Sequence, residues 1–128
     1  ISDNLLYTGS WAERKITIID ISNANNPKII SEVPLEGRAD GLSKSERTAV
    51  TRAFCDTVKS AGYTPMVYAS KSWFSNHLDV SKLSSYRIWV AHYAEKCGYT
   101  GTYHIWQNTD KGKVDGVPGY VDMNISSI

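Results

Sequence analysis

The pattern of apolar residues changes once along this chain, between residues 34 and 41, and this change constrains the fold more than any other feature. Before it, short β-branched runs alternate with turn residues, which is typical of antiparallel strands. After it, helical and strand patterns alternate, which is typical of parallel β/α units. We therefore expect an α/β fold in one domain, built from two unlike segments, residues 1–37 and residues 38–128.

Three short strands are expected in the first segment. The apolar runs Leu5–Thr8, Lys15–Asp20 and Lys28–Val33 are separated by Gly9-Ser10 and by the turn-forming residues 23–27. This layout predicts an antiparallel β-meander. Because two or three isolated strands cannot bury both of their faces, the meander is expected to pack on the second segment.

An amphipathic helix is expected at the start of the second segment. Ser43 followed by Glu46 has the spacing of a capping box, and Gly62 supplies a stop. Between these signals the large apolar residues fall on one helical face. That face carries Val50, Phe54, Val58 and Ala61.

Strands and short helices are expected to alternate in the rest of the chain. The expected strands are residues 65–69, 87–92, 102–107 and 120–123, with short helical stretches at 72–77 and 80–83. A complete eight-stranded β/α barrel needs roughly 200 to 250 residues. A chain of 128 residues is too short to form one.

The charge balance excludes several kinds of partner. Lys and Arg number 14 against 13 Asp and Glu, and no run of like charge occurs, so we expect neither nucleic acid nor a membrane surface as a partner. The apolar runs are too short for a membrane span, and the start of the chain lacks the layout of a signal peptide. The composition leaves the cellular location unknown.

The two cysteines, Cys55 and Cys97, leave two alternatives open. They could form one disulfide, or they could be two buried thiols. Their spacing fits no zinc pattern, and His77, His92 and His104 have no cysteine or serine at a suggestive distance along the chain. We therefore expect no metal and no cofactor, and structural roles for the three histidines.

Six motifs in the second segment carry a resemblance to a known family. In chain order they are Ala53-Phe54-Cys55, Ala61-Gly62-Tyr63, Val67–Ser70, Trp89–Tyr93, Ile105–Gln107 and Val121–Asn124. Over residues 36–128 the chain resembles the C-terminal half of a glycoside hydrolase family 25 lysozyme. This resemblance implies half of a TIM-like β/α barrel, a muramidase ancestry, peptidoglycan or another amino-sugar glycan as partner, and an extracellular parent enzyme.

The resemblance also implies roles for individual residues. Glu36 matches the general acid of the family's Asp-x-Glu motif, Pro34 stands where that motif has Asp, and Asp122 matches an acidic residue at the end of the last barrel strand. The catalytic candidates are therefore Glu36 and Asp122. Positions expected to line a sugar groove are Tyr68, Trp89, Trp106 and Gln107. From the residues alone, other interpretations stay open. Glu36 could be a solvated loop carboxylate, Asp122 a turn or cap residue, and Trp89 and Trp106 core residues.

The first segment suggests a different origin. Residues 15–37 are similar to one blade repeat of the LVIVD-type β-propellers, so the chain resembles a chimera or an engineered protein. Two half-barrels could also pair as a homodimer with two-fold symmetry. Because Pro34 replaces Asp and the front half of the barrel is missing, we expect lost or strongly impaired activity. The alternative is a non-catalytic domain with at most weak glycan binding.

Overall fold

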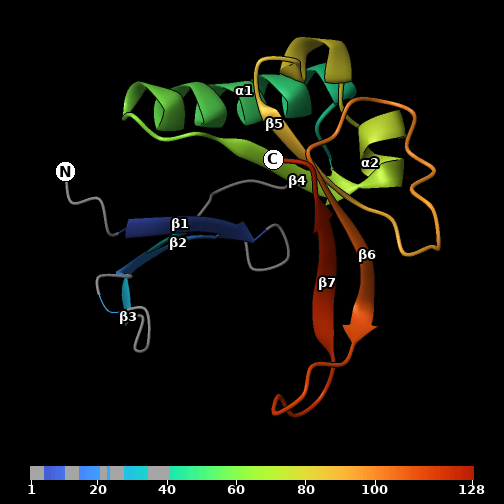
Figure 1. The fold of residues 1–128 in the computed structure, drawn as a ribbon. Helices are drawn as coiled ribbons and strands as arrows, with labels where there is room; N and C mark the ends of the chain where they lie inside the picture. The colour runs from blue at the N-terminus through green and yellow to red at the C-terminus, as the bar shows by residue number, and fades with distance from the viewer. Residues whose placement is uncertain (1–4, 11–14, 21–22, 24–27, 35–40) are drawn as a thin grey trace. The chain divides into compact units, whose positions relative to one another are not determined.

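The computed structural model describes residues 5–10, 15–20, 23, 28–34 and 41–128. Helices and strands are both present, so the chain is of the mixed α/β class (Figure 1). It divides into two compact units, residues 1–41 and residues 42–128. This boundary lies at the end of the stretch where the sequence pattern changes.

The first unit contains a three-stranded antiparallel sheet. Its strands β1 (Leu5–Ser10), β2 (Lys15–Asp20) and β3 (Lys28–Pro34) pair in chain order. The register between β2 and β3 shifts at Ile18 and Ile19, which marks a bulge. The strands lie close to the ranges expected from the β-branched runs.

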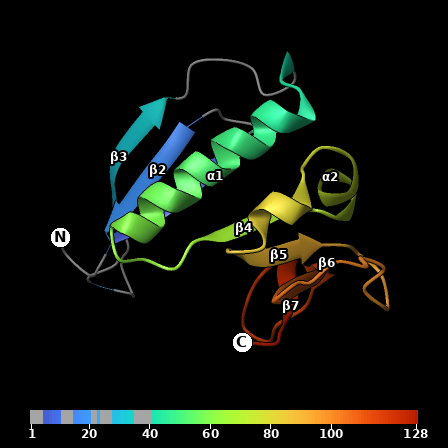
Figure 2. The same cartoon turned by 90° about the horizontal axis from the view of Figure 1, so that it is seen from above.

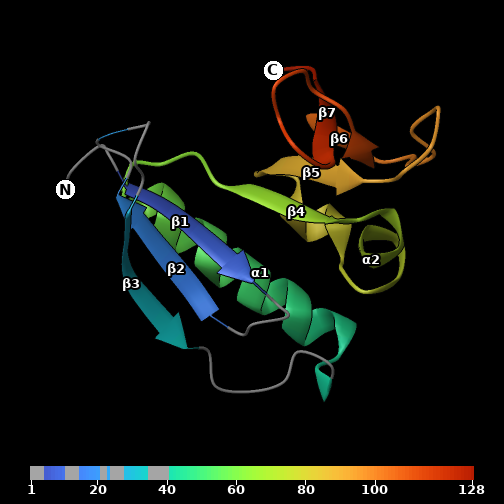
Figure 3. The same ribbon diagram turned by 90° about the horizontal axis from the view of Figure 1, so that it is seen from below.

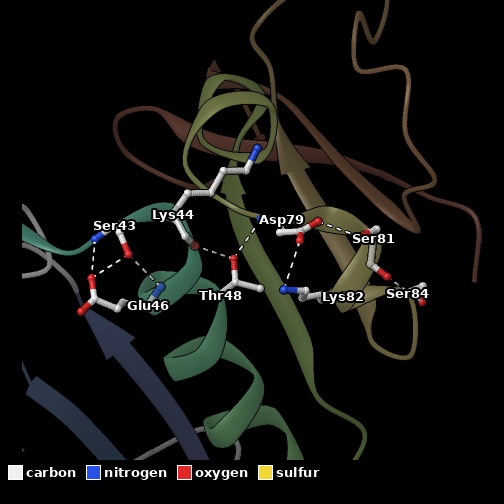
Figure 4. Close-up of polar contacts among 8 residues, drawn as sticks. All are labelled: Ser43, Lys44, Glu46, Thr48, Asp79, Ser81, Lys82 and Ser84. Atoms are coloured by element: carbon white, nitrogen blue, oxygen red, sulfur yellow. Dashed lines mark hydrogen bonds and ion pairs between the residues drawn. The ribbon is translucent and has the colours of Figure 1, made fainter.

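Helix α1 (Lys44–Ser60) opens the second unit and begins at a capping box (Figure 4). The Glu46 backbone N–H donates to Ser43 Oγ over 3.3 Å, and the Ser43 N–H donates to the Glu46 carboxylate over 2.8 Å. The Ser43 hydroxyl also donates to this carboxylate over 2.7 Å. The hydrogen bonds from the Ser43 hydroxyl and then from its backbone N–H lower the pKa of Glu46. Gly62, with φ of 90°, follows the helix end. Both the capping box and the glycine stop are confirmed.

The buried face of α1 is not the one that the apolar stripe predicts. Val50 is 51% exposed and Phe54 is 41% exposed, whereas Thr48 and Cys55 are buried. Thr48 and Cys55 are seven residues apart and therefore lie on one face two turns apart. The helix packs through this face, which turns Val50 and Phe54 toward the surface. The predicted helix is confirmed, and its apolar stripe and its buried face are different faces.

A four-stranded mixed sheet forms the centre of the second unit. Its strands are β4 (Met66–Ser70), β5 (Arg87–Ala91), β6 (Ile105–Gly112) and β7 (Val121–Ser126), and they follow one another in this order across the sheet (Figure 2). β4, β5 and β6 are parallel, and β7 is antiparallel to β6.

The expected parallel pattern therefore holds for β4 to β6 and is wrong for β7. Residues 113–120 join β6 to β7, whereas a parallel crossover needs about a dozen residues or more. Gly116 and Gly119 adopt positive φ values of 80° and 89° within this connection and allow the chain to reverse. The two strands consequently form a long hairpin.

The short helices expected between β4 and β5 are present. They are α2 (Lys71–Asn76) and the 3-10 helix η2 (Val80–Leu83). Together with α1 they cover one side of the sheet (Figure 1), and the core lies between them and the strands. The core residues are Cys55, Val67, Phe74, Leu78, Leu83, Tyr86, Ile88, Val90 and Trp106. In the described part of the chain, no helix has the length and apolar content that crossing a membrane requires.

Cys55 and Cys97 are both free thiols. Cys55 is buried in the core, and this burial, together with the neighbouring Asp56 carboxylate, raises the pKa of its thiol to about 11. The structure therefore has two free thiols and no disulfide, and of the two expected buried thiols only Cys55 is buried, because Cys97 is partly exposed.

Thr48 connects α1 to η2 through a buried hydroxyl group. Its Oγ1 donates to the Lys44 carbonyl over 2.7 Å and accepts from the Asp79 backbone N–H over 2.9 Å (Figure 4). Asp79 precedes η2, and its carboxylate accepts from the Ser81 hydroxyl over 2.7 Å. One threonine hydroxyl thus holds the turn before η2 against the helix.

We predict that Thr48→Val destabilises the fold by about 1–3 kcal/mol, because the Asp79 N–H loses its acceptor in a part-buried position. Urea unfolding followed by circular dichroism measures this change. Thr48→Ser keeps the hydroxyl and serves as the matched control, with a smaller loss from the missing methyl group. Equal stability of Thr48→Val and the wild type would show that this hydrogen bond contributes nothing.

Candidate functional site

Side-chain alternation gives the four-stranded sheet two unlike faces. Val67, Val90 and Trp106 face the helices and belong to the core. Their neighbours along the strands, Tyr68 and Gln107 among them, therefore point to the opposite face. This second face is rich in aromatic and polar groups, and we call it the polar face, defined by Tyr68, Trp89, Gln107, Asp122 and Asn124.

Tyr68 and Trp89 form an aromatic pair on the polar face. They are partners in the register of β4 and β5, and their rings meet edge to face with centroids 4.9 Å apart and an interplanar angle of 65°. The Trp89 indole Nε1–H donates to Asn124 Oδ1 over 2.8 Å. Tyr68 is 48% exposed, so part of its ring surface is open to a ligand.

Gln107 fixes two tyrosine hydroxyl groups. Its side chain is only 2% exposed, and its Oε1 accepts from the Tyr68 hydroxyl over 2.7 Å and from the Tyr93 hydroxyl over 3.1 Å. A buried amide held in this way has little freedom to reorient. Gln107 was expected to line a sugar groove; in the structure its buried amide oxygen accepts from both tyrosine hydroxyls.

The pKa of Tyr68 is raised. The main cause is burial of its hydroxyl, followed by the influence of Tyr93 and of the Asp122 carboxylate, while the hydrogen bond to Gln107 acts in the opposite direction. Asp122 therefore lies close enough to Tyr68 for its negative charge to contribute to the raised pKa of the Tyr68 hydroxyl. The structure brings one of the two catalytic candidates to the polar face.

An open groove of about 720 Å³ lies at the carboxyl ends of β4 and β5. It is bordered by Tyr68 and Tyr93 and by residues that follow the two strands: Ser70, Lys71, Ser72, Ser75, Asn76, Ala91 and His92. α2 and the connection between β5 and β6 lie at this same end of the sheet (Figure 3). The carboxyl ends of parallel strands are the usual position of ligand sites in α/β folds.

Trp106 does not lie on the groove surface. It is 8% exposed within the hydrophobic core, and its indole Nε1–H donates to the His92 carbonyl over 2.7 Å. The expectation that its ring lines a sugar groove is corrected accordingly. Its register position opposite Val90 places it on the helix-covered face, and from there it supports the groove through the main chain of His92.

Glu36 lies outside the described residues. Within residues 5–10, 15–20, 23, 28–34 and 41–128, no group of three or more His, Cys, Asp or Glu side chains is arranged to hold a metal ion.

Sequence reasoning missed Tyr93, Asn124 and His92 as site residues. Tyr93 and His92 follow directly after β5, and Asn124 is two positions from Asp122 on the same strand. Polar residues just beyond a parallel strand gather at the carboxyl edge, and residues two apart on a strand share a face. These two rules could have identified Tyr93, His92 and Asn124 from the sequence.

The arrangement suits a carbohydrate. Exposed aromatic rings accept the C–H faces of a pyranose ring, and neighbouring hydroxyl, amide and carboxylate groups bind its hydroxyls. Tyr68 and Trp89 supply the rings, and Ser70, Ser72 and Asn76 line the groove beside Tyr68. The fold is of the mixed α/β class, and an aromatic and polar surface lies at the carboxyl ends of its parallel strands.

Comparison with known proteins gives the family. The profile of the glycosyl hydrolases family 25 matches residues 7–117, so the chain belongs to this family. The protein YegX of Escherichia coli, from O157:H7 and from strain K12, is 28% identical over 109 residues, which is 84% of this chain and 39% of YegX. The chain thus spans well under half the length of these relatives.

A solved structure is similar to part of the chain. It is the crystal structure of the CTP1L endolysin, an endolysin whose activity is regulated by a secondary translation product. The similarity has a TM-score of 0.55 and 32% identity, and it covers 62% of this chain and 30% of the endolysin chain.

The comparisons do not support a propeller origin for the first segment. The family match covers residues 7–117 and so includes the whole of residues 15–37, the segment that resembles an LVIVD-type repeat. A separate source for residues 15–37 is not needed to account for this match.

We predict that Asp122→Asn lowers the pKa of Tyr68, because removing a nearby negative charge makes the phenolate easier to form. NMR titration of a protein with ¹³C-labelled tyrosine rings, followed through alkaline pH, reports this shift. Asp115→Asn, in the connection between β6 and β7, is the matched control and should leave Tyr68 unchanged. An unchanged Tyr68 in Asp122→Asn would mean that the two side chains are not neighbours in solution.

Proposed function

We propose that this chain is a lysozyme-like domain that binds peptidoglycan and corresponds to the second half of a β/α barrel muramidase acting at the cell wall, outside the cell. Family membership and the similarity to an endolysin support this assignment. Three parallel strands, β4 to β6, with helices on one side also fit half of a β/α barrel.

The pairing of Tyr68 with Trp89 beside the groove carries the proposal. Tyr68 belongs both to this aromatic pair and to the groove lining, so a sugar ring in the groove would meet an aromatic surface. Gln107 holds the Tyr68 hydroxyl in place, and this leaves the rest of the exposed ring oriented before the ligand arrives. Preorganised contacts of this kind lower the entropy cost of binding.

Catalysis is proposed to be strongly impaired. Hydrolysis of a glycosidic bond usually needs two carboxyl groups flanking it, and we assign these roles to Glu36 as general acid and Asp122 as its partner. Pro34 stands where the Asp of the Asp-x-Glu motif is expected, and a proline ring cannot stabilise a developing positive charge. Loss of one catalytic group commonly lowers the rate by roughly three to six orders of magnitude in other hydrolases.

Pro34 also favours the second candidate function, a domain that binds glycan without cleaving it. In that case the groove and the polar face bind glycan, and no cleavage follows.

A homodimer with two-fold symmetry stays a prediction. In the described part of the chain, β7 is an end strand of its sheet, and Met123 and Ile125 on it are exposed. Light scattering of the purified protein measures the mass that decides this point.

We predict that Tyr68→Ala weakens binding to insoluble peptidoglycan by about tenfold, because it removes a stacking surface worth roughly 1–1.5 kcal/mol. Co-sedimentation at a series of peptidoglycan concentrations measures the affinity. Tyr120→Ala makes the same chemical change at another exposed tyrosine, outside the groove lining, and should bind like the wild type. If both variants lose affinity equally, or neither does, the groove is not the glycan site.

We predict that the wild type clears suspensions of Gram-positive cell walls very slowly and that Pro34→Asp clears them faster, because it restores the motif. Glu36→Gln should abolish the clearing by Pro34→Asp when the two changes are combined, since no general acid remains. The fall in turbidity over time at a fixed protein concentration measures the clearing. Glu95→Gln combined with Pro34→Asp is the matched control, because it makes the same chemical change at another glutamate, and it should clear like Pro34→Asp alone. Clearing that survives Glu36→Gln would overturn the role assigned to Glu36.

A further inference from the structure

The groove at the carboxyl ends of β4 and β5 contains one residue with a permanent charge, Lys71. The remaining groove lining consists of hydroxyl, amide, imidazole and apolar groups, and no acidic residue is among them. Among the described residues, no carboxylate lies within ion-pair distance of the Lys71 ammonium group. A cation without an internal partner beside an open groove is available to an anionic ligand.

His92 presents a second donor to the groove. The Gly98 backbone N–H donates to His92 Nδ1 over 3.0 Å, so a neutral His92 carries its ring proton on Nε2. The main chain of His92 is held on both sides: its N–H donates to the Gln107 carbonyl over 3.0 Å, and its carbonyl accepts from Trp106. The imidazole is therefore fixed in position, with Nε2–H as its remaining donor.

Lys71 and His92 meet above Gly98. A Cβ atom added to Gly98 would come within 3.0 Å of Lys71 Nζ and within 3.0 Å of His92 Cε1. The ammonium group and the imidazole ring therefore share the space that a side chain at residue 98 would fill. Two nitrogen donors brought together from α2 and from the end of β5 form a suitable pair for the two oxygens of a carboxylate.

We propose that Lys71, with His92, is a specificity-determining residue that binds a carboxylate carried by the glycan, so that the groove selects an acidic amino sugar over a neutral one. This inference rests on the proposed function, because it names which sugars the same groove prefers. The affinity gained by stacking on Tyr68 and Trp89 does not depend on the charge of the sugar. The Lys71 ammonium group adds affinity only for a sugar that carries a negative charge.

The test uses the full chain and three soluble probes of equal length. The first is a peptidoglycan glycan strand stripped of its peptides, in which every second sugar bears a carboxylate. The second is the same strand with its carboxylates converted to methyl esters, and the third is a neutral oligomer of N-acetylglucosamine. Isothermal titration calorimetry gives the affinity for each probe.

We expect the wild type to bind the acidic strand about tenfold more tightly than either neutral probe, as for loss of one charged hydrogen bond. Lys71→Met should remove this preference and leave binding to the neutral probes unchanged. Lys71→Arg should keep most of it, because the positive charge remains. Lys82→Met removes a charge at an exposed ion pair with Asp79 and should behave like the wild type.

Two results would overturn the inference in different ways. If the wild type binds all three probes equally, or if Lys71→Met weakens all three equally, Lys71 does not read the carboxylate, while glycan binding itself stands. If the wild type binds none of the probes, the proposed function fails and this inference fails with it.

Discussion

Packing of α1, α2 and η2 against one side of the four-stranded sheet is the constraint on which the rest of this protein depends. Val67, Ile88 and Val90 are drawn into that interface by the hydrophobic effect. Because side chains alternate along a strand, burial of these residues forces Tyr68 and Trp89 to the other face. The polar face is thus a consequence of how the core is formed, and a one-residue slip in register would exchange the two.

The core and the groove are connected through a few residues that serve both. Trp106 is buried among apolar side chains, yet its indole N–H holds the carbonyl of His92 at the groove. Gln107, the next residue, accepts two tyrosine hydroxyls through its side chain and the His92 N–H through its carbonyl. Changes in the core at Trp106 are therefore expected to reach the groove through His92 and Gln107.

Binding and cleavage place different demands on this chain. Binding needs aromatic surfaces and donors that a rigid sheet can hold, and the second unit contains them. Cleavage needs two carboxyl groups at a defined separation, and these are assigned to Glu36 and Asp122, which are far apart in the sequence. In the proposed function, proline at position 34 affects cleavage and leaves the groove residues unchanged. Under the proposed function, the chain keeps a groove for binding and lacks one of the carboxyl groups that cleavage needs.

The sequence by itself determined the local structure and the family. The capping box at Ser43, the stop at Gly62 and the short helices between β4 and β5 follow from neighbouring residues, and spaced motifs were sufficient to indicate a glycoside hydrolase. The same motifs nominated Tyr68 and Trp89, which the structure brings together on the polar face.

Only the tertiary structure decided which side of each element is buried and which distant residues meet. It turned Val50 and Phe54 outward, placed Trp106 in the core, made β7 antiparallel, and brought Lys71 beside His92 above Gly98. Local patterns record contacts between residues a few positions apart, since helix and strand periods are set by the backbone. Burial and strand pairing depend on contacts across the whole unit, and no short stretch of sequence contains them.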